Sequence, residues 1–226
     1  MQKRTLHRVG AVCAILGVLV TGLAHAVHPD LPPDAGAFLK GVAESNGWIA
    51  IHWGLLMGLL LMQVGFTAAM LTLREQPSKQ DAGGWGLLGL YALLVGLAAW
   101  CGVFTVEAAL KPLADAVRSD AALLGGARAL ASLGDAGVSA GAIVYWAGIA
   151  LLGTGMMVSP RYPAWLGGIG LVLGAAMSLG VGLPRAFLGA SAWTERMGFP
   201  VLAIATLLWT VLLGGVLWRT AGARRR

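Results

Sequence analysis

Three of the chain's four histidines, His25, His28 and His52, fall within one short stretch of the sequence. His25 and His28 are three residues apart at the end of one apolar block, and His52 lies about one helical turn inside the next block. Neutral imidazole is a ligand of zinc, copper and haem iron. If the two blocks form adjacent helices, the three side chains lie in one layer and form a candidate site for a metal ion or haem.

Carboxylates and one tryptophan at the ends of later apolar blocks extend this candidate site. Glu107 follows the third block, and Glu195 precedes the sixth block with Trp193 beside it. A carboxylate can complete the coordination shell of a metal, so the metal hypothesis includes Glu107. For a small ligand in place of a metal, the candidate binding residues are His52, Glu107, Trp193 and Glu195.

The alternative is that these polar side chains serve only the fold and the membrane interface. In that case the histidines are hydrated by headgroup water, and His52 donates a hydrogen bond to a backbone carbonyl. Spacing alone does not define the geometry of a ligand set. A transmembrane haem relay is disfavoured because it needs histidines in both leaflets, and the opposite leaflet has only His7.

The composition indicates which elements position these residues. The chain has 226 residues, of which 58% are hydrophobic and only 12% are charged, whereas a soluble domain carries about 25% charged residues. The net charge of +6 comes from basic residues at the ends of apolar blocks. That placement indicates membrane topology and contact with anionic membrane lipids, and it gives no reason to expect a nucleic-acid partner.

Six apolar blocks are each long enough to cross a hydrocarbon core of about 30 Å at about 1.5 Å per residue. They cover approximately residues 9–27, 48–73, 85–106, 138–158, 165–183 and 199–218. The sequence therefore predicts an all-α polytopic membrane bundle of six transmembrane helices, which forms a single integral membrane domain over residues 1–226.

The first block has a second interpretation. A basic start, an apolar stretch and the sequence Ala24-His25-Ala26 are similar to a secretory signal with its cleavage site. We favour a retained first helix because the block is longer than the usual apolar region of a signal peptide, which is roughly 7–15 residues. Cleavage after Ala26 would remove His25 and leave five helices.

The polar links between the blocks contain two further predicted helices. Asp34 is expected to be the N-cap of a short helix in the first link. In the link over residues 107–137, one apolar helix face is formed by Leu113, Val117, Ala121 and Leu124. We therefore predict an extracytoplasmic amphipathic helix between the third and fourth spans, lying on the outer membrane face.

Glycines at helical spacing occur in several of the blocks. They include Gly54 and Gly58, then Gly141, Gly148 and Gly155, and finally Gly170 and Gly174. Small residues at such spacings allow the backbones of two helices to approach closely. These faces predict close helix packing, within the chain or against a second copy in a homo-oligomer.

The basic residues also predict the topology. They concentrate in the two tails and in the short links after the second and fourth blocks, whereas eight of the ten acidic residues fall in the three longer links. By the positive-inside rule, both termini face the cytoplasm and the longer links face outward. The cytoplasmic links are too short to fold as a catalytic domain, and the sequence has no P-loop or HExxH motif.

The order of features resembles a family of uncharacterised bacterial multi-pass membrane proteins, known as a domain of unknown function. The matching segments are HPDLPPDAGAFLKGVAESNGW, VEAALKPLADA and SPRYPAWLGGIGLVLGA, together with His52 one turn into the second span. The family pattern often has an aspartate where this chain has Glu107. The resemblance implies a six-helix protein of the bacterial cytoplasmic (inner) membrane, and it implies no activity.

Three functions follow as hypotheses. The first is a non-enzymatic membrane protein with an outward-facing pocket for a small or lipid-like ligand. The second is an outward-facing metal- or haem-binding protein that uses His25, His28 and His52, and that is redox-active if its metal is. The third is a small-solute transporter. The six predicted spans contain no acidic or basic residue, which argues against transport that is coupled to an ion.

Overall fold

The computed structural model describes residues 3–29, 34–75, 81–191 and 193–222. Within these ranges the protein is an all-α bundle, and six helical segments are long and apolar enough to cross a membrane. The helices are α1 Lys3–Ala26, α2 Ala35–Glu44, α3 Trp48–Arg74, α4 Ala82–Val117, α5 Leu124–Val158, α6 Ala164–Met177, α7 Leu183–Leu188 and α8 Phe199–Gly222. The predicted multi-pass helical membrane bundle is therefore confirmed.

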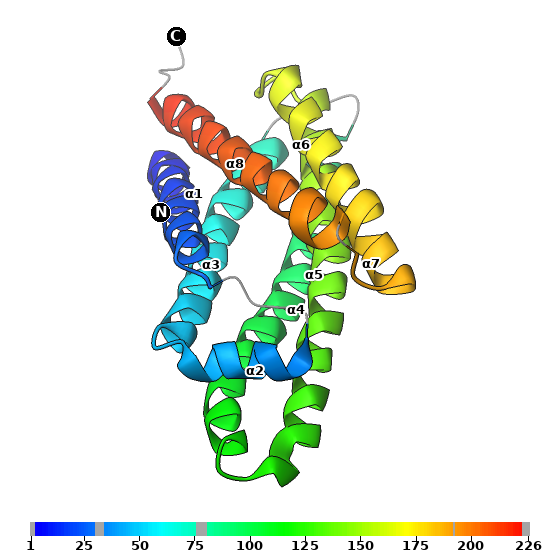
Figure 1. The fold of residues 1–226 in the computed structure, drawn as a ribbon. Coiled ribbons are helices and arrows are strands. Elements are labelled where there is room, and N and C mark those ends of the chain that lie inside the picture. Colours follow the sequence, from blue (N-terminus) through cyan, green and yellow to red (C-terminus); the bar gives the residue numbers. More distant parts are fainter. Residues whose placement is uncertain (1–2, 30–33, 76–80, 192, 223–226) are drawn as a thin grey trace.

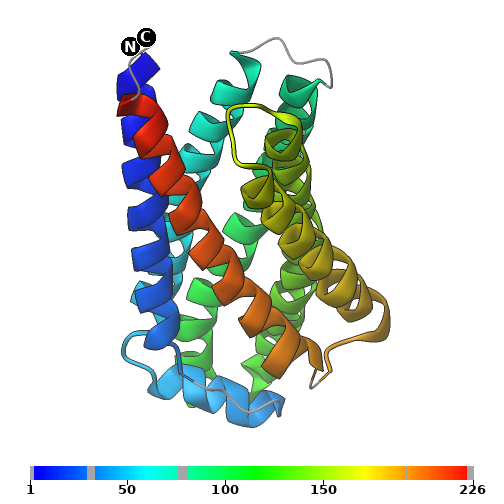
Figure 2. The ribbon, with the colours of Figure 1, turned by 90° about the horizontal axis from the view of Figure 1, so that it is seen from above.

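The spanning segments form a closed ring. Around it, α1 packs against α3, α3 against α4, α4 against α5 and α5 against α6. Helix α8 completes the circuit because it crosses the bundle diagonally and packs against both α6 and α1 (Figure 1). Figure 2 shows that α1 begins and α8 ends at the same end of the bundle, and that α2 lies across the opposite end. We call these the terminal end and the distal end.

Glycines form the closest contacts between neighbours in the ring. A Cβ atom on Gly58 of α3 would lie 2.9 Å from the backbone oxygen of Gly17 in α1, and one on Gly148 of α5 would lie 2.6 Å from the backbone nitrogen of Leu93 in α4. No larger residue permits such approaches without a shift of the backbone. The predicted glycine faces therefore pack against helices of the same chain, and association of a second copy through glycine-rich faces stays a prediction.

Aromatic rings fill the interior of the ring of helices. Phe66 of α3 contacts the rings of Tyr145 in α5 and Trp209 in α8, with centroids 6.4 and 6.0 Å away. Trp146 of α5 contacts the ring of Trp100 in α4 at 6.0 Å. All five side chains are buried, so they form an aromatic layer in the interior of the bundle.

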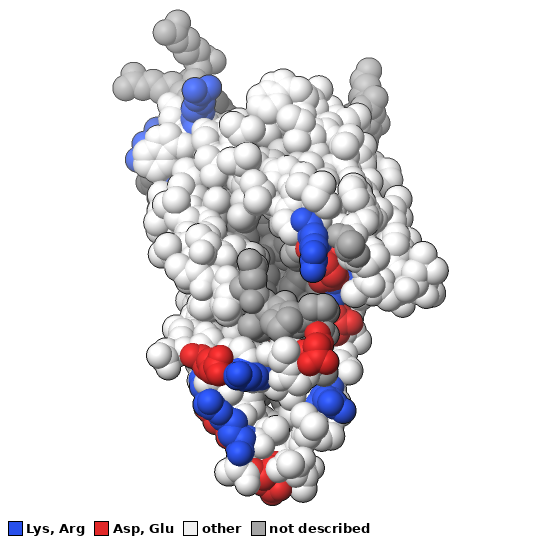
Figure 3. Space-filling view, viewed as in Figure 1, with Lys and Arg blue, Asp and Glu red and all other residues white. Residues whose placement is uncertain are grey.

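The distal end extends beyond the predicted membrane core. Helices α4 and α5 contain 36 and 35 residues, so each is over 50 Å long at about 1.5 Å per residue, compared with about 30 Å for the hydrocarbon core. Their distal parts form a hairpin with α2 lying across it (Figure 1). On the face in Figure 3, charged side chains gather at this end and are sparse over the middle of the bundle.

Helix α2 forms as the sequence predicts. The carboxylate of Asp34 accepts a hydrogen bond from the backbone nitrogen of Ala37 at 2.8 Å and caps the helix. Leu39 and Val42 are buried from α2 in a small core with Leu110 of α4. This second core holds α2 against the hairpin outside the ring of helices.

The link between the third and fourth spans differs in detail from the prediction. The segment is helical, but it continues α4 and α5 and is not a separate helix lying on the membrane face. Helix α4 passes through Pro112, which removes one backbone donor, because Leu110 and Ala114 on either side of it are buried in the core formed with α2. The short helix that lies across the distal end is α2.

Candidate functional site

A cluster of two histidines and two aromatic residues lies where the distal end of α3 packs against α4. Trp48 is the first residue of α3, and His52 follows one turn later with its ring centroid 4.3 Å from that of Trp48. His28 lies beyond the end of α1, with its centroid 5.3 Å from those of both residues. Phe104 of α4 contacts His52 at 6.3 Å. We call these four residues the histidine–tryptophan cluster.

Backbone carbonyls orient the imidazoles in this region. Nδ1 of His52 lies 2.8 Å from the carbonyl oxygen of Trp48. Nδ1 of His28 lies 2.9 Å from the carbonyl oxygen of Pro29, and Nδ1 of His25 lies 3.0 Å from that of Thr21. A carbonyl oxygen only accepts hydrogen bonds, so Nδ1 carries the proton in the neutral imidazole and Nε2 carries the lone pair. Metal-ligating histidines commonly donate their other ring N–H in this way.

The three predicted histidine ligands are not equivalent. Ring contacts join His28 to His52 but, among the described residues, none joins either of them to His25, which is exposed. The described residues also contain no group of three or more His, Cys, Asp or Glu placed to hold a metal ion. The geometry therefore provides two closely placed imidazoles, and the three-histidine site stays a prediction.

Glu107 joins this cluster through its backbone. The indole Nε1 of Trp48 donates a hydrogen bond to the carbonyl oxygen of Glu107 at 2.6 Å. The side-chain Oε2 of Glu107 is enclosed and has no hydrogen-bond partner among the described residues. An ion pair between Glu107 and Lys111 does not form, because Lys111 donates to Asp115 at 2.9 Å and to the carbonyl oxygen of Ala43 at 2.8 Å.

Trp193 and Glu195 belong to a separate set of contacts. Trp193 is exposed, whereas Glu195 forms an ion pair with Arg185, a buried residue of α7 that also pairs with Asp135 of α5. Asp135 lies close enough to Glu107 to interact with it electrostatically. Asp135 and Arg185 therefore connect the two predicted carboxylates, Glu107 and Glu195. Neither Asp135 nor Arg185 is among the residues predicted from the sequence.

A cavity of about 200 Å³ lies between α2 and the tip of the hairpin of α4 and α5. Its walls are mostly apolar and include Leu39, Val117 and Leu124, while Lys40 and Arg118 add two cationic groups. It is partly open to solvent. The predicted ligand-binding residues His52, Glu107, Trp193 and Glu195 do not line it. Sequence reasoning missed this cavity because α2 and the hairpin are far apart in the chain.

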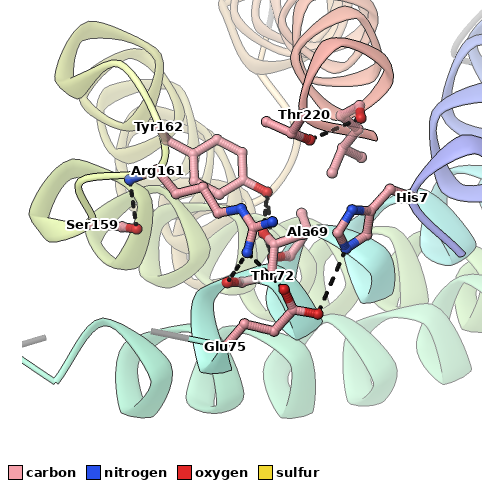
Figure 4. A network of polar contacts seen from close by, with 9 residues as sticks. His7, Ala69, Thr72, Glu75, Ser159, Arg161, Tyr162 and Thr220 are labelled. Carbon is pink, nitrogen blue, oxygen red and sulfur yellow. Dashed lines mark hydrogen bonds and ion pairs between the residues drawn. The ribbon is translucent and has the colours of Figure 1, made fainter. Parts of the chain in front are cut away.

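A further buried group of polar side chains forms a network at the terminal end (Figure 4). Arg161 Nη1 lies 2.7 Å from Glu75 Oε2, and His7 Nε2 lies 3.9 Å from Glu75 Oε1. The hydroxyl groups of Tyr162 and Thr72 are hydrogen-bonded, and both side chains are buried. The network ties α1 and α3 to the turn between α5 and α6, which is a structural role.

Comparisons with known proteins add no relative. No protein-family model matches the chain. A search of curated proteins and a search of solved structures also find no match. The geometry of the distal end therefore carries the functional argument.

Replacement of Tyr162 by phenylalanine should change the alkaline stability of the protein. Burial raises the pKa of Tyr162 to about 12, although the hydrogen bond with Thr72 and the nearby charge of Arg161 oppose that shift. An unfolded tyrosine has a pKa of about 10. Between about pH 10 and 12, the unfolded state loses this proton first, so the stability of the wild type falls as the pH rises. The expected loss is roughly 2 to 3 kcal/mol.

Thermal unfolding in detergent between pH 8 and pH 12 checks this expectation. Tyr162→Phe should be less stable than the wild type at pH 8 because a buried hydrogen bond is lost, and its stability should depend less steeply on pH above 10. Replacement of the exposed Tyr91 by phenylalanine should leave the wild-type pH dependence in place. Equal pH dependence in all three proteins would contradict the argument.

Proposed function

We propose that the protein is a non-enzymatic, multi-pass protein of the bacterial cytoplasmic (inner) membrane, and that its distal end binds a small anionic, lipid-like ligand. Both termini face the cytoplasm in this proposal, because the basic residues gather in the tails and shortest links. The distal end, with α2 and the hairpin of α4 and α5, then faces outward. Membrane lipids surround the ring.

The cavity beside α2 supports this proposal. Its volume of about 200 Å³ corresponds to roughly seven water molecules at about 30 Å³ each. That space suits a charged head group with a short apolar chain. Leu39, Val117 and Leu124 suit the apolar part, and Lys40 and Arg118 suit an anionic group. Lys40 makes only a long, exposed ion pair with Glu44 at 3.9 Å, so its ammonium group can turn to a ligand.

Binding of hexanoate tests this proposal, with hexan-1-ol as the uncharged probe of equal chain length. The purified protein is placed in phosphatidylcholine nanodiscs, and binding is measured by calorimetry against empty nanodiscs. Hexanoate should bind more tightly than hexan-1-ol, because Lys40 and Arg118 attract only the anion. The double variant Lys40→Ala, Arg118→Ala should weaken hexanoate binding by about tenfold or more, since two charge-assisted contacts are lost.

Arg128→Ala is the matched control, because Arg128 is an exposed cation of the same hairpin that does not line the cavity. It should leave hexanoate binding unchanged. Equal binding of hexanoate and hexan-1-ol, or an equal loss in Arg128→Ala, would contradict the proposed site.

A metal site in the histidine–tryptophan cluster is the second candidate function. The observation that favours it is the pairing of His28 with His52, whose ring centroids are 5.3 Å apart, with Nδ1 of each ring hydrogen-bonded to a backbone carbonyl. Zinc and copper are the metals that two imidazoles suit best, with water or a bound molecule as the further ligands. A transmembrane haem relay remains the less favoured arrangement, because His7 is the only described histidine at the terminal end.

Titration of the detergent-purified, chelator-treated protein with Zn²⁺ and Cu²⁺ tests this second candidate. One equivalent of metal should bind to the wild type, and His28→Ala and His52→Ala should each lower the affinity by about tenfold or more. His25→Ala should retain most of the affinity, because His25 makes no ring contact with the pair. Equal affinities for the wild type and His52→Ala would rule out this site.

A further inference from the structure

Four buried polar atoms in the interior of the ring of helices have no hydrogen-bond partner among the described residues. They are Oε1 and Nε2 of Gln63 in α3, the hydroxyl oxygen of Tyr145 in α5 and the indole Nε1 of Trp100 in α4. Gln63 is 6% exposed, Tyr145 is 2% exposed and Trp100 is 5% exposed. Gln63 lies near the middle of the second predicted span, and its amide bonds no group of a neighbouring helix among the described residues.

Several other polar groups of the interior are satisfied, whereas the hydroxyl of Thr21 in α1, which lies against Gly58 of α3, is a further buried group without a partner among the described residues. The indole of Trp146 donates to the hydroxyl of Thr206 at 3.1 Å, and the indole of Trp209 donates to the carbonyl oxygen of Leu166 at 2.8 Å. Ser178 donates to the carbonyl oxygen of Ile143 at 2.9 Å. These interior donors are therefore paired within the bundle, because an unpaired polar group in the membrane core is costly.

The three unpaired residues lie around one aromatic layer. Gln63 is one helical turn from Phe66 on the same face of α3, and the ring of Phe66 contacts that of Tyr145 at 6.4 Å. Tyr145 and Trp100 both contact the ring of Trp146, at 5.4 and 6.0 Å. The three residues thus belong to one connected set of side chains on α3, α4 and α5.

Glycines bring two of these side chains close to the facing backbone. A Cβ atom on Gly96 of α4 would lie 2.4 Å from the backbone nitrogen of Tyr145, and one on Gly141 of α5 would lie 2.8 Å from Nε1 of Trp100. The close contact of α4 and α5 therefore holds the tyrosine and the indole inside the ring.

We propose that Gln63, Tyr145 and Trp100 form an interior binding site for a small neutral molecule that both donates and accepts hydrogen bonds. The amide of Gln63 offers two donors and an acceptor, the hydroxyl of Tyr145 offers one of each, and the indole of Trp100 only donates. The six predicted spans contain no Asp, Glu, Lys or Arg, so a charged ligand finds no counter-ion there. Water and a small neutral solute such as an amide or alcohol share the required chemistry.

This site is distinct from the distal cavity, and it concerns the middle of the bundle. Polar groups that face the interior of a membrane bundle are costly and can mark the path of a substrate. The site gives the small-solute hypothesis a location, although its ligand is neutral and no ion coupling is implied.

Replacement of Gln63 by leucine separates an occupied site from an empty one. An amide that no molecule satisfies is unfavourable in an apolar core, so Gln63→Leu would leave the melting temperature in detergent unchanged or raise it. An amide that holds a bound molecule loses its hydrogen bonds on substitution, and the melting temperature should fall by about 2–4 °C or more. Met62→Leu is the control, because Met62 is the buried neighbour and the change nearly conserves volume.

Two further measurements distinguish bound water from a retained solute. Both are made on the wild type and on the variants Gln63→Leu and Tyr145→Phe. X-ray hydroxyl-radical footprinting labels side chains beside bound water, so labelling of Trp100 that falls in the variants assigns the site to water. Native mass spectrometry detects a retained solute, so an adduct that is lost in the variants assigns it to a neutral solute. The proposal requires the lower melting temperature together with one of these two signals. An unchanged or higher melting temperature in Gln63→Leu, or the absence of both signals, would overturn it.

Discussion

The close approach of helix backbones at glycine is the constraint on which the rest of this structure depends. Lipid gives helices no hydrophobic reason to associate, so packing contacts and interhelical hydrogen bonds must hold the bundle together. Gly58 against Gly17 brings α3 to α1, Gly148 against Leu93 brings α5 to α4, and Gly214 brings α8 to α1. These contacts close the ring, and the closed ring determines which side chains face its interior.

The contact between α4 and α5 also determines the shape of the distal end. Because the two helices stay together beyond the predicted membrane core, they form a hairpin on which α2 can pack. That packing creates the cavity beside Lys40 and Arg118, and it brings Trp48 to the carbonyl oxygen of Glu107. The histidine–tryptophan cluster and the cavity are therefore two products of one arrangement, and both face outward in the proposed topology.

Much of the fold can be predicted from the sequence because lipid imposes strong local rules. Block lengths identify the six spans, and glycine spacing identifies their close contacts. Asp34 as an N-cap is a local signal of the same kind. The continuity of α4 through Pro112 is not predictable in this way, because burial of Leu110 and Ala114 against α2 keeps the helix intact.

The candidate site is less predictable, because its geometry depends on contacts between distant segments. The sequence places His28 and His52 in one layer, and the structure brings their rings together while His25 stays outside those contacts. The pairing of Arg185 with Asp135 joins α7 to α5. In the sequence, Arg185 is notable only as a basic residue that follows Pro184 near a predicted helix end. Nothing in the sequence indicates its partner.

Disulfide cross-linking between α1 and α8 tests the closure of the ring most directly. A Cβ atom on Gly214 would lie 2.9 Å from Cγ1 of Ile15, whereas one on Gly215 has no neighbour within 4 Å. In a chain whose Cys13 and Cys101 are replaced by alanine, oxidation should link Ile15→Cys to Gly214→Cys within one molecule. The pair Ile15→Cys and Gly215→Cys should remain unlinked. Equal linking of both pairs, or linking of neither, would contradict a ring closed by α8.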